Sequence, residues 1–491
     1  MTERFQLIIN GESRDSSSGQ WFDAENPFDG ACWAEVPRCN EEDVNLAVAA
    51  ASKAFESGVW PTLSATQRGV LLIKAGHLIR ERAEQLAILE TKDTGKRFAE
   101  SSPQMTGIAD WFDYYGGLAD KVQGQVIPSN PEVVVNYTVH EPLGVVAAIT
   151  PWNSPIMIAV WKIAPALAAG NTVIVKPSEH ASTSTLALME VFRDAGFPPG
   201  VVNVITGFPA ECGQALVTHP DVAKVTFTGS DNGGRIINTQ AAESFKRVTM
   251  ELGGKSPQLI FADAVLENAV HGVISGIFLS NGQTCVAGSR VYLQSSIKEQ
   301  FLNRLRDKIQ NLKMGDPFDK ETRIGPIANT MQFQRIVGFL EETLASGATC
   351  VTGGKVAEGD NLGRGHFIEP TIFTDVDPTS RVACEEVFGP VLTVFEFDTE
   401  DQALELANNT PYGLAAGVWT SNIPRAMRLS RKIRSGTVYI NTYRAVNVAS
   451  PVGGYKKSGF GRENGIEAIY EYLQTKSVWL GTQDVVPNPL D

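Results

Sequence analysis

Apolar runs and amphipathic runs alternate along the middle of the chain. Short, nearly continuous apolar runs predict buried strands at 143–150, 171–177, 200–206 and 223–229. Runs with helical spacing predict helices between and after them, at 154–170, 182–196, 210–219 and 232–243. Apolar strands that alternate with helices are typical of a parallel sheet covered by helices on both faces.

A similar alternation, with different spacing, returns in the second half of the chain. Amphipathic helices are predicted at 296–312 and 332–347, and strands at 390–397, 413–420 and 435–441. This pattern predicts a second α/β domain.

The segment 121–140 interrupts both patterns and is predicted to form a hairpin with Pro and Asn turns. A long hairpin outside a domain needs a partner for its edges, so we expect the chain to form a homo-oligomer, a dimer or a tetramer.

Composition narrows the class of protein. A chain of 491 residues is too long for one compact core, so two or three domains are expected. Its 43% hydrophobic and 20% charged residues are ordinary for a soluble globular protein. The formal net charge of −13 argues against a nucleic-acid-binding surface.

Several absences in the sequence point to a cytoplasmic protein without a metal. The six cysteines are scattered without a CxxC pair, which fits a reducing compartment. The six histidines form neither HxH nor HExxH, and no secretory signal is evident at the N-terminus. The apolar stretch 156–175 is not expected to span a membrane, because Lys162, Pro165, Gly170 and Asn171 break it.

One cysteine lies in an unusual setting. Cys285 stands in "FLSNGQTCVAGSR", with Gly282 and Gly288 on either side. Structural cysteines usually lie among large apolar neighbours, whereas small residues suggest an accessible turn with room for a ligand. This thiol is therefore either incidental or a nucleophile.

Two strand ends are candidates for a nucleotide site. Lys176 and Glu179 follow a predicted strand, where ligands bind in open α/β sheets, although a solvated lysine and a helix-start acid would look the same. "VTFTGSDNGGRI" opens a helix after a strand but is not the usual glycine fingerprint, and an ordinary turn remains possible. The segment 459–465, "GFGRENG", matches the spacing of that fingerprint, but no strand is predicted before it. It is therefore not expected to bind phosphate.

Two polar residues at strand ends could take part in catalysis. Glu251 follows an apolar strand and precedes two glycines, so it is either a general base or a cap or ion-pair residue. Asn153 lies in a turn between Pro151 and Pro155, where its amide could face a developing oxyanion or could serve only the turn.

The order of several motifs resembles one known family. "PWNSP", "KPSE", "FTGS", "ELGGKSP", "GQTCVAGSR", "EEVFGPVL" and "GGYKKSGFGRENG" occur as they do in the NAD(P)-dependent aldehyde dehydrogenase superfamily. The resemblance covers nearly the whole chain and favours a hydrolytic, non-acylating member. It implies a Rossmann-like cofactor domain at 1–118 and 142–252, a second α/β catalytic domain at 253–455, and a small β oligomerisation arm with a C-terminal tail at 119–141 and 456–491.

The resemblance implies roles for the catalytic candidates. Cys285 matches the nucleophile, Glu251 the general base, and Asn153 the oxyanion donor beside the Cys285 N–H. Lys162 and Glu463 match a proposed proton path, although a supporting salt bridge is as plausible for them. Members that pass the acyl group to coenzyme A generally lack a carboxylate at the position of Glu251, which favours water as the acceptor.

The resemblance also implies an NAD site. Lys176 and Glu179 match contacts to the adenosine ribose, Ser178 between them matches a cofactor-binding position, and Glu179 should disfavour NADP. The remaining matches are contacts to the pyrophosphate and the nicotinamide half of the cofactor, or packing contacts: Ile149, Thr150, Pro151, Trp152, Gly229, Ser230, Leu252, Gln332, Glu386 and Phe388.

Substrate choice is the least determined feature. By family position the entry tunnel is mostly apolar, which favours an aromatic or medium aliphatic aldehyde over a quaternary ammonium aldehyde; its residues are Ser154, Met157, Ile158, Trp161, Leu279, Val446 and Val452. Arg444 also borders this mouth, where it could recruit a semialdehyde acid or could be solvated or paired at a subunit interface. A non-catalytic relative and a coenzyme A-acylating enzyme remain as alternatives.

Overall fold

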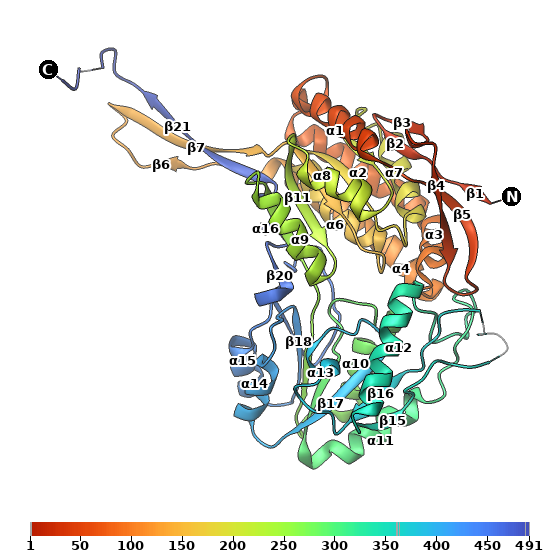
Figure 1. Cartoon of the computed structure of the whole chain (residues 1–491). Helices are drawn as coiled ribbons and strands as arrows, with labels where there is room; N and C mark the ends of the chain where they lie inside the picture. The colour runs from red at the N-terminus through yellow and green to blue at the C-terminus, as the bar shows by residue number, and fades with distance from the viewer. Residues whose placement is uncertain (1, 360–361, 363, 487, 491) are drawn as a thin grey trace.

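The computed structural model contains four β-sheets arranged in two lobes and a protruding arm (Figure 1). It describes residues 2–359, 362, 364–486 and 488–490. Residues 1, 360–361, 363, 487 and 491 fall within the predicted domains and tail but lie outside the described residues.

The first lobe is built on an eight-stranded sheet of order β20-β12-β11-β8-β9-β10-β2-β3. Its parallel centre consists of β8 (Val145–Ile149), β9 (Thr172–Lys176), β10 (Val202–Val204), β11 (Val222–Thr228) and β12 (Arg247–Glu251). Antiparallel strands complete the edges: β2 (Leu7–Ile9), β3 (Glu12–Arg14) and β20 (Gly459–Phe460). The predicted parallel α/β sheet is confirmed: β8, β9 and β10 are buried along their whole length, while β11 and β12 alternate apolar and polar side chains.

Helices cover both faces of this sheet. The helices of the first lobe are α1 (Glu41–Glu56), α2 (Ala65–Glu81), α3 (Ala83–Thr94), α4 (Phe98–Gly107), α5 (Ala109–Leu118), α6 (Pro155–Ala168), α7 (Thr183–Ala195), α8 (Gln214–Thr218) and α9 (Asp231–Ala242). Val146 and Val173 pack with α2, α5, α6 and α7, while Val145 and Ile174 pack with α1 and α8 on the opposite face. Helix α6 is buried on nearly all sides, which explains why its sequence is almost wholly apolar.

The second lobe holds a seven-stranded sheet of order β15-β16-β17-β14-β13-β18-β19. Its strands are β13 (Pro257–Ile260), β14 (Arg290–Gln294), β15 (Thr349–Thr352), β16 (Thr371–Thr374), β17 (Val391–Phe397), β18 (Ala415–Trp419) and β19 (Thr437–Ile440). All neighbours pair in parallel except the edge strand β15. The helices are α10 (Leu266–Ile277), α11 (Lys298–Ile309), α12 (Thr330–Ala345), α13 (Arg381–Cys384), α14 (Glu400–Asn408) and α15 (Ile423–Lys432).

The remaining two sheets have three strands each. One lies near the N-terminus, with β1 (Glu3–Arg4), β5 (Ala31–Pro37) and β4 (Trp21–Asn26). The other forms the arm, with β6 (Val126–Ile127), β7 (Val134–Pro142) and β21 (Leu473–Gly481). The predicted hairpin is present, since Val126 pairs with Tyr137 in antiparallel register.

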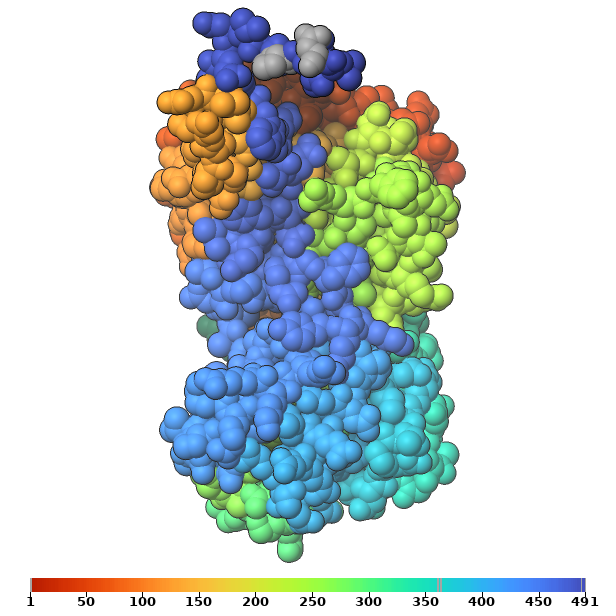
Figure 2. Space-filling view, turned by 90° about the vertical axis from the view of Figure 1, so that its left-hand side faces the viewer, coloured from red at the N-terminus to blue at the C-terminus, as the bar shows by residue number. Residues whose placement is uncertain are grey.

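The chain's last segment connects both lobes to the arm. It leaves the second lobe, contributes β20 to the eight-stranded sheet, turns through α16 (Glu467–Tyr470), and enters the arm as β21 (Figure 2). The range 456–491 therefore supplies strands to two sheets, and the domain boundaries drawn from the sequence stay a prediction. Among the described residues, no helix is both long enough and apolar enough to cross a membrane.

Candidate active site

The three catalytic candidates come together where the two lobes meet. Glu251 is the last residue of β12, and Asn153 follows β8 in the same sheet. Cys285 comes from the second lobe, in the turn after the 3₁₀ helix Leu279–Gly282. The Asn153 amide donates to the main-chain oxygen of Gln283 at 2.9 Å, which ties it to the segment that carries Cys285.

The loop before Cys285 is held in an unusual conformation. Ser280, Asn281 and Gly282 have φ values of 51°, 54° and 70°, in the left-handed region that costs energy for the first two. The Asn281 side chain fixes the loop, because it donates to Pro326 O at 2.7 Å and accepts from Gly325 N at 3.0 Å. Such enforced strain is typical of a functional segment.

The thiol of Cys285 is partly accessible but is not activated by its surroundings. Burial of the surrounding site, together with the nearby carboxylates of Glu386 and Glu251, raises the pKa of Cys285 to about 12. The Arg444 guanidinium opposes this rise. The thiol must therefore lose its proton to a base as it attacks.

Glu251 is placed to be that base. Its side chain is only 6% exposed, and among the described residues its Oε1 has no hydrogen-bond partner. Burial, with repulsion from Glu463, raises the pKa of Glu251 well above its ordinary value, while Lys162 opposes the rise. A buried carboxylate without a partner is costly, which makes a functional reason for its presence stronger than a capping one.

Lys162 and Glu463 form a buried ion pair close to Glu251. Neither side chain is more than 2% exposed. The Lys162 Nζ also donates to Thr228 Oγ1 at 2.8 Å and Thr226 Oγ1 at 3.3 Å. The pair is thus part of a polar network beside the base, which is compatible with both roles predicted for it.

The turn between β11 and α9 is shaped for an anionic ligand. Ser230 caps α9 by accepting from Gly233 N at 3.1 Å, and Gly229 N donates to Glu251 O at 3.1 Å. A Cβ on Gly229 would come within 2.4 Å of the Phe227 ring, so a side chain has no room there. The open N-terminus of a twelve-residue helix suits a pyrophosphate.

The strand end of β9 adds a cation and a carboxylate nearby. Lys176 Nζ donates to Pro177 O at 3.0 Å, and Ser178 Oγ donates to Glu179 at 3.3 Å. The Glu179 side chain is about one-fifth exposed, so it is available to ligand hydroxyls. Together with the α9 turn, these groups fit a dinucleotide.

Glu386 and Phe388 close the second lobe's side of the site. The Glu386 carboxylate accepts from Gly254 N at 3.0 Å, and burial raises its pKa to about 7. Phe388 has φ 58° and packs edge-on against Trp152, with ring centroids 5.2 Å apart. Gln332 donates to Val387 O and Phe388 O at 2.8 and 3.0 Å, so it supports this turn.

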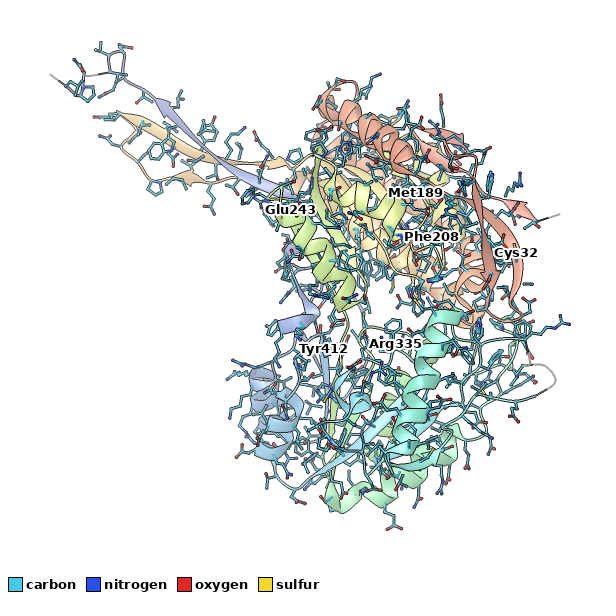
Figure 3. All side chains as sticks on the ribbon, in the orientation of Figure 1. Cys32, Met189, Phe208, Glu243, Arg335 and Tyr412 are labelled. Atoms are coloured by element: carbon cyan, nitrogen blue, oxygen red, sulfur yellow. The ribbon has the colours of Figure 1, made fainter. Side chains whose placement is uncertain are left out.

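Two more hydrogen bonds lie beside the site. The Tyr412 hydroxyl of the second lobe donates to Asp231, at the start of α9 in the first lobe, at 3.3 Å. Within the second lobe, Arg335 donates to the main-chain oxygen of Glu386 at 2.9 Å. Figure 3 shows Tyr412 and Arg335 on the side of the second lobe that faces the first. Four more residues predicted to belong to the cofactor site lie at the ends of β8 and β12; they are Ile149, Thr150, Pro151 and Leu252.

The predicted tunnel residues come from three segments. Ile158 and Trp161 of α6 are buried in the apolar cluster, with Met157 and Val452 packed against it. Trp161 stacks on Trp111 at 6.0 Å between ring centroids. Leu279 precedes the strained loop, Ser154 is the residue before α6 and accepts from Lys96, and Val446 is 51% exposed in a loop of the second lobe.

Arg444 is bonded to the loop that carries the nucleophile. It donates to Ser275 O, Leu279 O and Ser280 Oγ at 3.2–3.3 Å and has φ 59°. Glu100 accepts from the Ser280 N–H and hydroxyl at 2.8 Å each. Arg444 is therefore not a freely solvated side chain, one of the readings that the sequence left open.

Several buried lysines near the site were not singled out from the sequence. Lys96 Nζ donates to Glu90, to Gln104 and to Ser154, the neighbour of Asn153. Lys224 lies on the polar face of β11. Polar residues recur at alternate positions of β11 and β12, and this period of two indicates a polar face; they are Lys224, Thr226, Thr228, Thr249 and Glu251. In the part of the chain that the structure describes, no group of His, Cys, Asp or Glu is arranged to hold a metal.

Comparison with known proteins agrees with this geometry. Residues 14–478 match the model of the aldehyde dehydrogenase family. The (Z)-2-((N-methylformamido)methylene)-5-hydroxybutyrolactone dehydrogenase of Acinetobacter baylyi is 45% identical, over all of this chain and 99% of that protein.

Solved structures give the same result. The NAD+ complex of an aldehyde dehydrogenase from Bacillus cereus is 42% identical, with a TM-score of 0.96 over 98% of this chain and 97% of that one. A betaine aldehyde dehydrogenase from Staphylococcus aureus in complex with NAD+ is 41% identical, with a TM-score of 0.96 over 98% and 95%. The chain belongs to the aldehyde dehydrogenase family.

Proposed function

We propose that this protein oxidises an aldehyde to the carboxylic acid with NAD as the oxidant, through a covalent intermediate on Cys285. The observation that carries this proposal is the meeting of a partly accessible thiol, an unpartnered buried carboxylate and a fixed amide at one strand-end site. An ordinary structural role would not require an unpaired Glu251.

The cofactor is NAD. The aldehyde dehydrogenase from Bacillus cereus whose structure contains NAD+ has the same fold as this chain. The groups at the ends of β9 and β11 fit a dinucleotide. The Glu179 carboxylate can accept the hydroxyls of an adenosine ribose and repels a 2′-phosphate, which disfavours NADP. Lys176, the N-terminus of α9 and Glu386 are the groups that would hold it.

The first step is attack of the Cys285 sulfur on the aldehyde carbon. Glu251 takes the thiol proton, directly or through water, because the thiol's high pKa leaves little thiolate at neutral pH. The oxyanion of the resulting thiohemiacetal is stabilised by the Asn153 amide and the Cys285 N–H. The bond of Asn153 to Gln283 O keeps the amide next to the nucleophile.

The second half of the reaction releases the acid. When bound, NAD accepts a hydride, which leaves a thioester on Cys285. Glu251 then removes a proton from the water that attacks the thioester. Burial raises the pKa of Glu251 above that of an ordinary carboxyl, which makes its carboxylate a stronger base for this proton.

The decisive experiment measures NADH formation with and without coenzyme A. Wild-type protein should make NADH and free acid without coenzyme A, and Cys285→Ser should make neither at a comparable rate. Strict dependence on coenzyme A would instead indicate an acylating enzyme, and wild-type protein without any NADH formation would indicate a non-catalytic relative.

An aromatic or medium aliphatic aldehyde fits the apolar lining. Met157, Trp161 and Val452 pack in or against the apolar cluster and offer few polar partners. A kcat/KM panel across aliphatic, aromatic, amino and acidic aldehydes tests this assignment.

A substrate that also carries a carboxylate is the second candidate, and Arg444 favours it. Its guanidinium lies at the loop before Cys285 and has no acceptor for Nε among the described residues. The relative from Acinetobacter is named for a 5-hydroxybutyrolactone, and such a ring is the closed form of an aldehyde acid.

The Arg444 assignment predicts a measurable preference. A contact between Arg444 and the carboxylate is worth roughly 1–2 kcal/mol, or about five- to thirty-fold in kcat/KM. Arg444→Met should erase this preference. Because Arg444 also bonds to the loop before Cys285, the readout is the ratio of kcat/KM for an acidic and a neutral aldehyde of equal length, which a general loss of activity leaves unchanged. If the wild type already prefers the neutral aldehyde, Arg444 is not a specificity residue.

The arm supports a homo-oligomer. Its strands β6 and β21 are at the edges of a narrow sheet, and Trp479 and Leu480 are 67% and 57% exposed. Burying such an edge against a second copy would remove this exposed apolar surface. Light scattering should report a dimer or a tetramer.

A further inference from the structure

Two charged side chains in the corner between α3 and α4 reach catalytic segments. This corner, residues 95–100, belongs to the first lobe. Lys96 donates to Ser154 Oγ at 2.9 Å, in the turn that carries the oxyanion donor. Glu100 accepts from the N–H and the hydroxyl of Ser280 at 2.8 Å each, in the strained loop before the nucleophile. The corner therefore contacts both the first-lobe and the second-lobe side of the active site.

Further hydrogen bonds connect these two contacts into a closed ring. Asn153, the neighbour of Ser154, donates to Gln283 O at 2.9 Å. The Gln283 N–H in turn donates to Ser280 O at 2.9 Å, and Ser280 is the residue that Glu100 binds. The short chain of the corner joins Glu100 back to Lys96. The members of this ring are Lys96, Glu100, Asn153, Ser154, Ser280 and Gln283.

The corner itself is fixed against the second lobe. Gly95 has φ 69°, and a Cβ there would lie 2.6 Å from Pro326 Cγ, so the backbone approaches that lobe closely. Arg97 donates to Thr322 O at 3.3 Å and also to the Glu100 carboxylate at 2.7 Å, which fixes the orientation of Glu100. A corner held in this way can transmit a fixed position to the groups that it binds.

Lys96 is a costly residue for an ordinary corner. Its side chain is 5% exposed and pairs with the fully buried Glu90, whose Oε2 has no hydrogen-bond partner among the described residues. An apolar pair of similar size is often as stable as a buried ion pair, so stability alone does not account for Lys96. Ser154 is unusual too, because it stands before α6 without capping it and accepts from Lys96 instead.

The chemistry requires a fixed distance between the oxyanion donor and the sulfur. The donor Asn153 comes from the first lobe and Cys285 from the second, and such a donor is effective only when it is already in place. We propose that the ring sets this distance and that Lys96 and Glu100 are positioning residues. Lys96 holds the turn of Asn153, and Glu100 holds the left-handed loop that leads to Cys285.

Glu100 is tested by the rate constant of the first NADH turnover, measured by stopped flow. Glu100→Ala removes the acceptor for Ser280 and should lower this rate constant about ten- to hundredfold, with an unchanged Kd for NAD, because a displacement of about 1 Å is that costly. Glu100→Gln keeps an acceptor oxygen and should retain most of the rate. Glu84→Gln, at an exposed carboxylate of α3, is the control and should match the wild type. A wild-type rate in Glu100→Ala would overturn the inference.

Lys96 is tested through its dependence on Asn153. Lys96→Met is combined with Glu90→Gln, because loss of the lysine alone would leave a buried carboxylate unpaired, and Glu90→Gln alone is the matched control. The combined variant should turn over about tenfold more slowly than its control, and this difference should disappear when Asn153 is already Ala, since residues that act through one another are not additive. An equal loss in both backgrounds would indicate a structural role only and would overturn the inference.

The inference rests on the proposed function, and hydrogen exchange separates the two because it needs neither aldehyde nor NAD. In a closed ring, the Lys96 variant should exchange faster at 278–286, a segment that Lys96 does not contact, and Glu100→Ala should exchange faster at 151–157. Should the Lys96 variant not fold, Glu100→Ala provides the same test. Faster exchange confined to the segment that each residue contacts would overturn the ring. A wild type that forms no NADH would contradict the proposed function instead.

Discussion

Replacing Glu251 by Gln tests the base without changing the shape of the site. The amide has nearly the volume of the carboxylate but cannot take a proton. The Oε1 atom of Glu251 has no protein partner among the described residues, so the change breaks no hydrogen bond of that atom and removes the cost of burying a charge. The free energy of unfolding should therefore stay the same or rise.

The catalytic effect of this substitution should be large. General base catalysis is worth roughly 10²- to 10⁴-fold, and at least 10²-fold corresponds to ~2.7 kcal/mol in the barrier. Because the folded protein raises the pKa of Glu251, the active carboxylate form is present only above that raised value. The wild-type rate of thioester hydrolysis should therefore rise with pH through it, and the variant should lack this limb.

Single-turnover and steady-state NADH measurements across pH 5–9 provide the assay. If Glu251 acts only on water, an NADH burst survives in Glu251→Gln and the steady-state phase collapses. If it also deprotonates Cys285, the burst slows as well. A variant with the wild-type steady-state rate and pH profile would refute the reasoning and leave Glu251 as an ion-pair residue.

Three further substitutions or treatments probe the rest of the site. Iodoacetamide should alkylate Cys285 in parallel with loss of activity. Because burial raises the pKa of Cys285, the alkylation rate should still be rising with pH at pH 9, and a plateau near pH 7 in mass-spectrometric time courses would contradict this. Glu179→Gln should raise kcat/KM for NADP relative to NAD, and equal use of both cofactors by the wild type would contradict the assignment. Gly253→Ala should displace Glu386, because the added Cβ would collide with its Oε2. Calorimetry should then show weaker NAD binding, with little change in melting temperature. Unchanged affinity would show that Glu386 can move at no cost.

Local patterns in the sequence predicted the fold well. The strands around β8, β9 and β11 are short apolar runs between helix signals, so their period and their boundaries are readable without knowledge of the rest of the chain. The strained loop was only partly visible. The dipeptide Asn281-Gly282 is a turn signal, but nothing local indicates that Ser280 is also left-handed.

Contacts between distant segments could not be derived in this way. Arg444 bonds to Ser280, 164 positions earlier, and Glu100 reaches the same residue from 180 positions away. The packing of the two lobes decides which polar residues come into contact. These contacts cannot be derived from the pattern of a single sequence. The identity of the chemistry therefore came from motif resemblance, and the neighbours that tune it came from the structure.

The high pKa of Cys285 has a consequence for survival under oxidative stress. Peroxides oxidise the thiolate, and burial beside two carboxylates keeps the Cys285 thiol protonated at pH 7. The idle enzyme should therefore tolerate peroxide that rapidly inactivates proteins with acidic cysteines. Its vulnerability arises only while the proton is being removed, so damage should accumulate with the number of turnovers rather than with time.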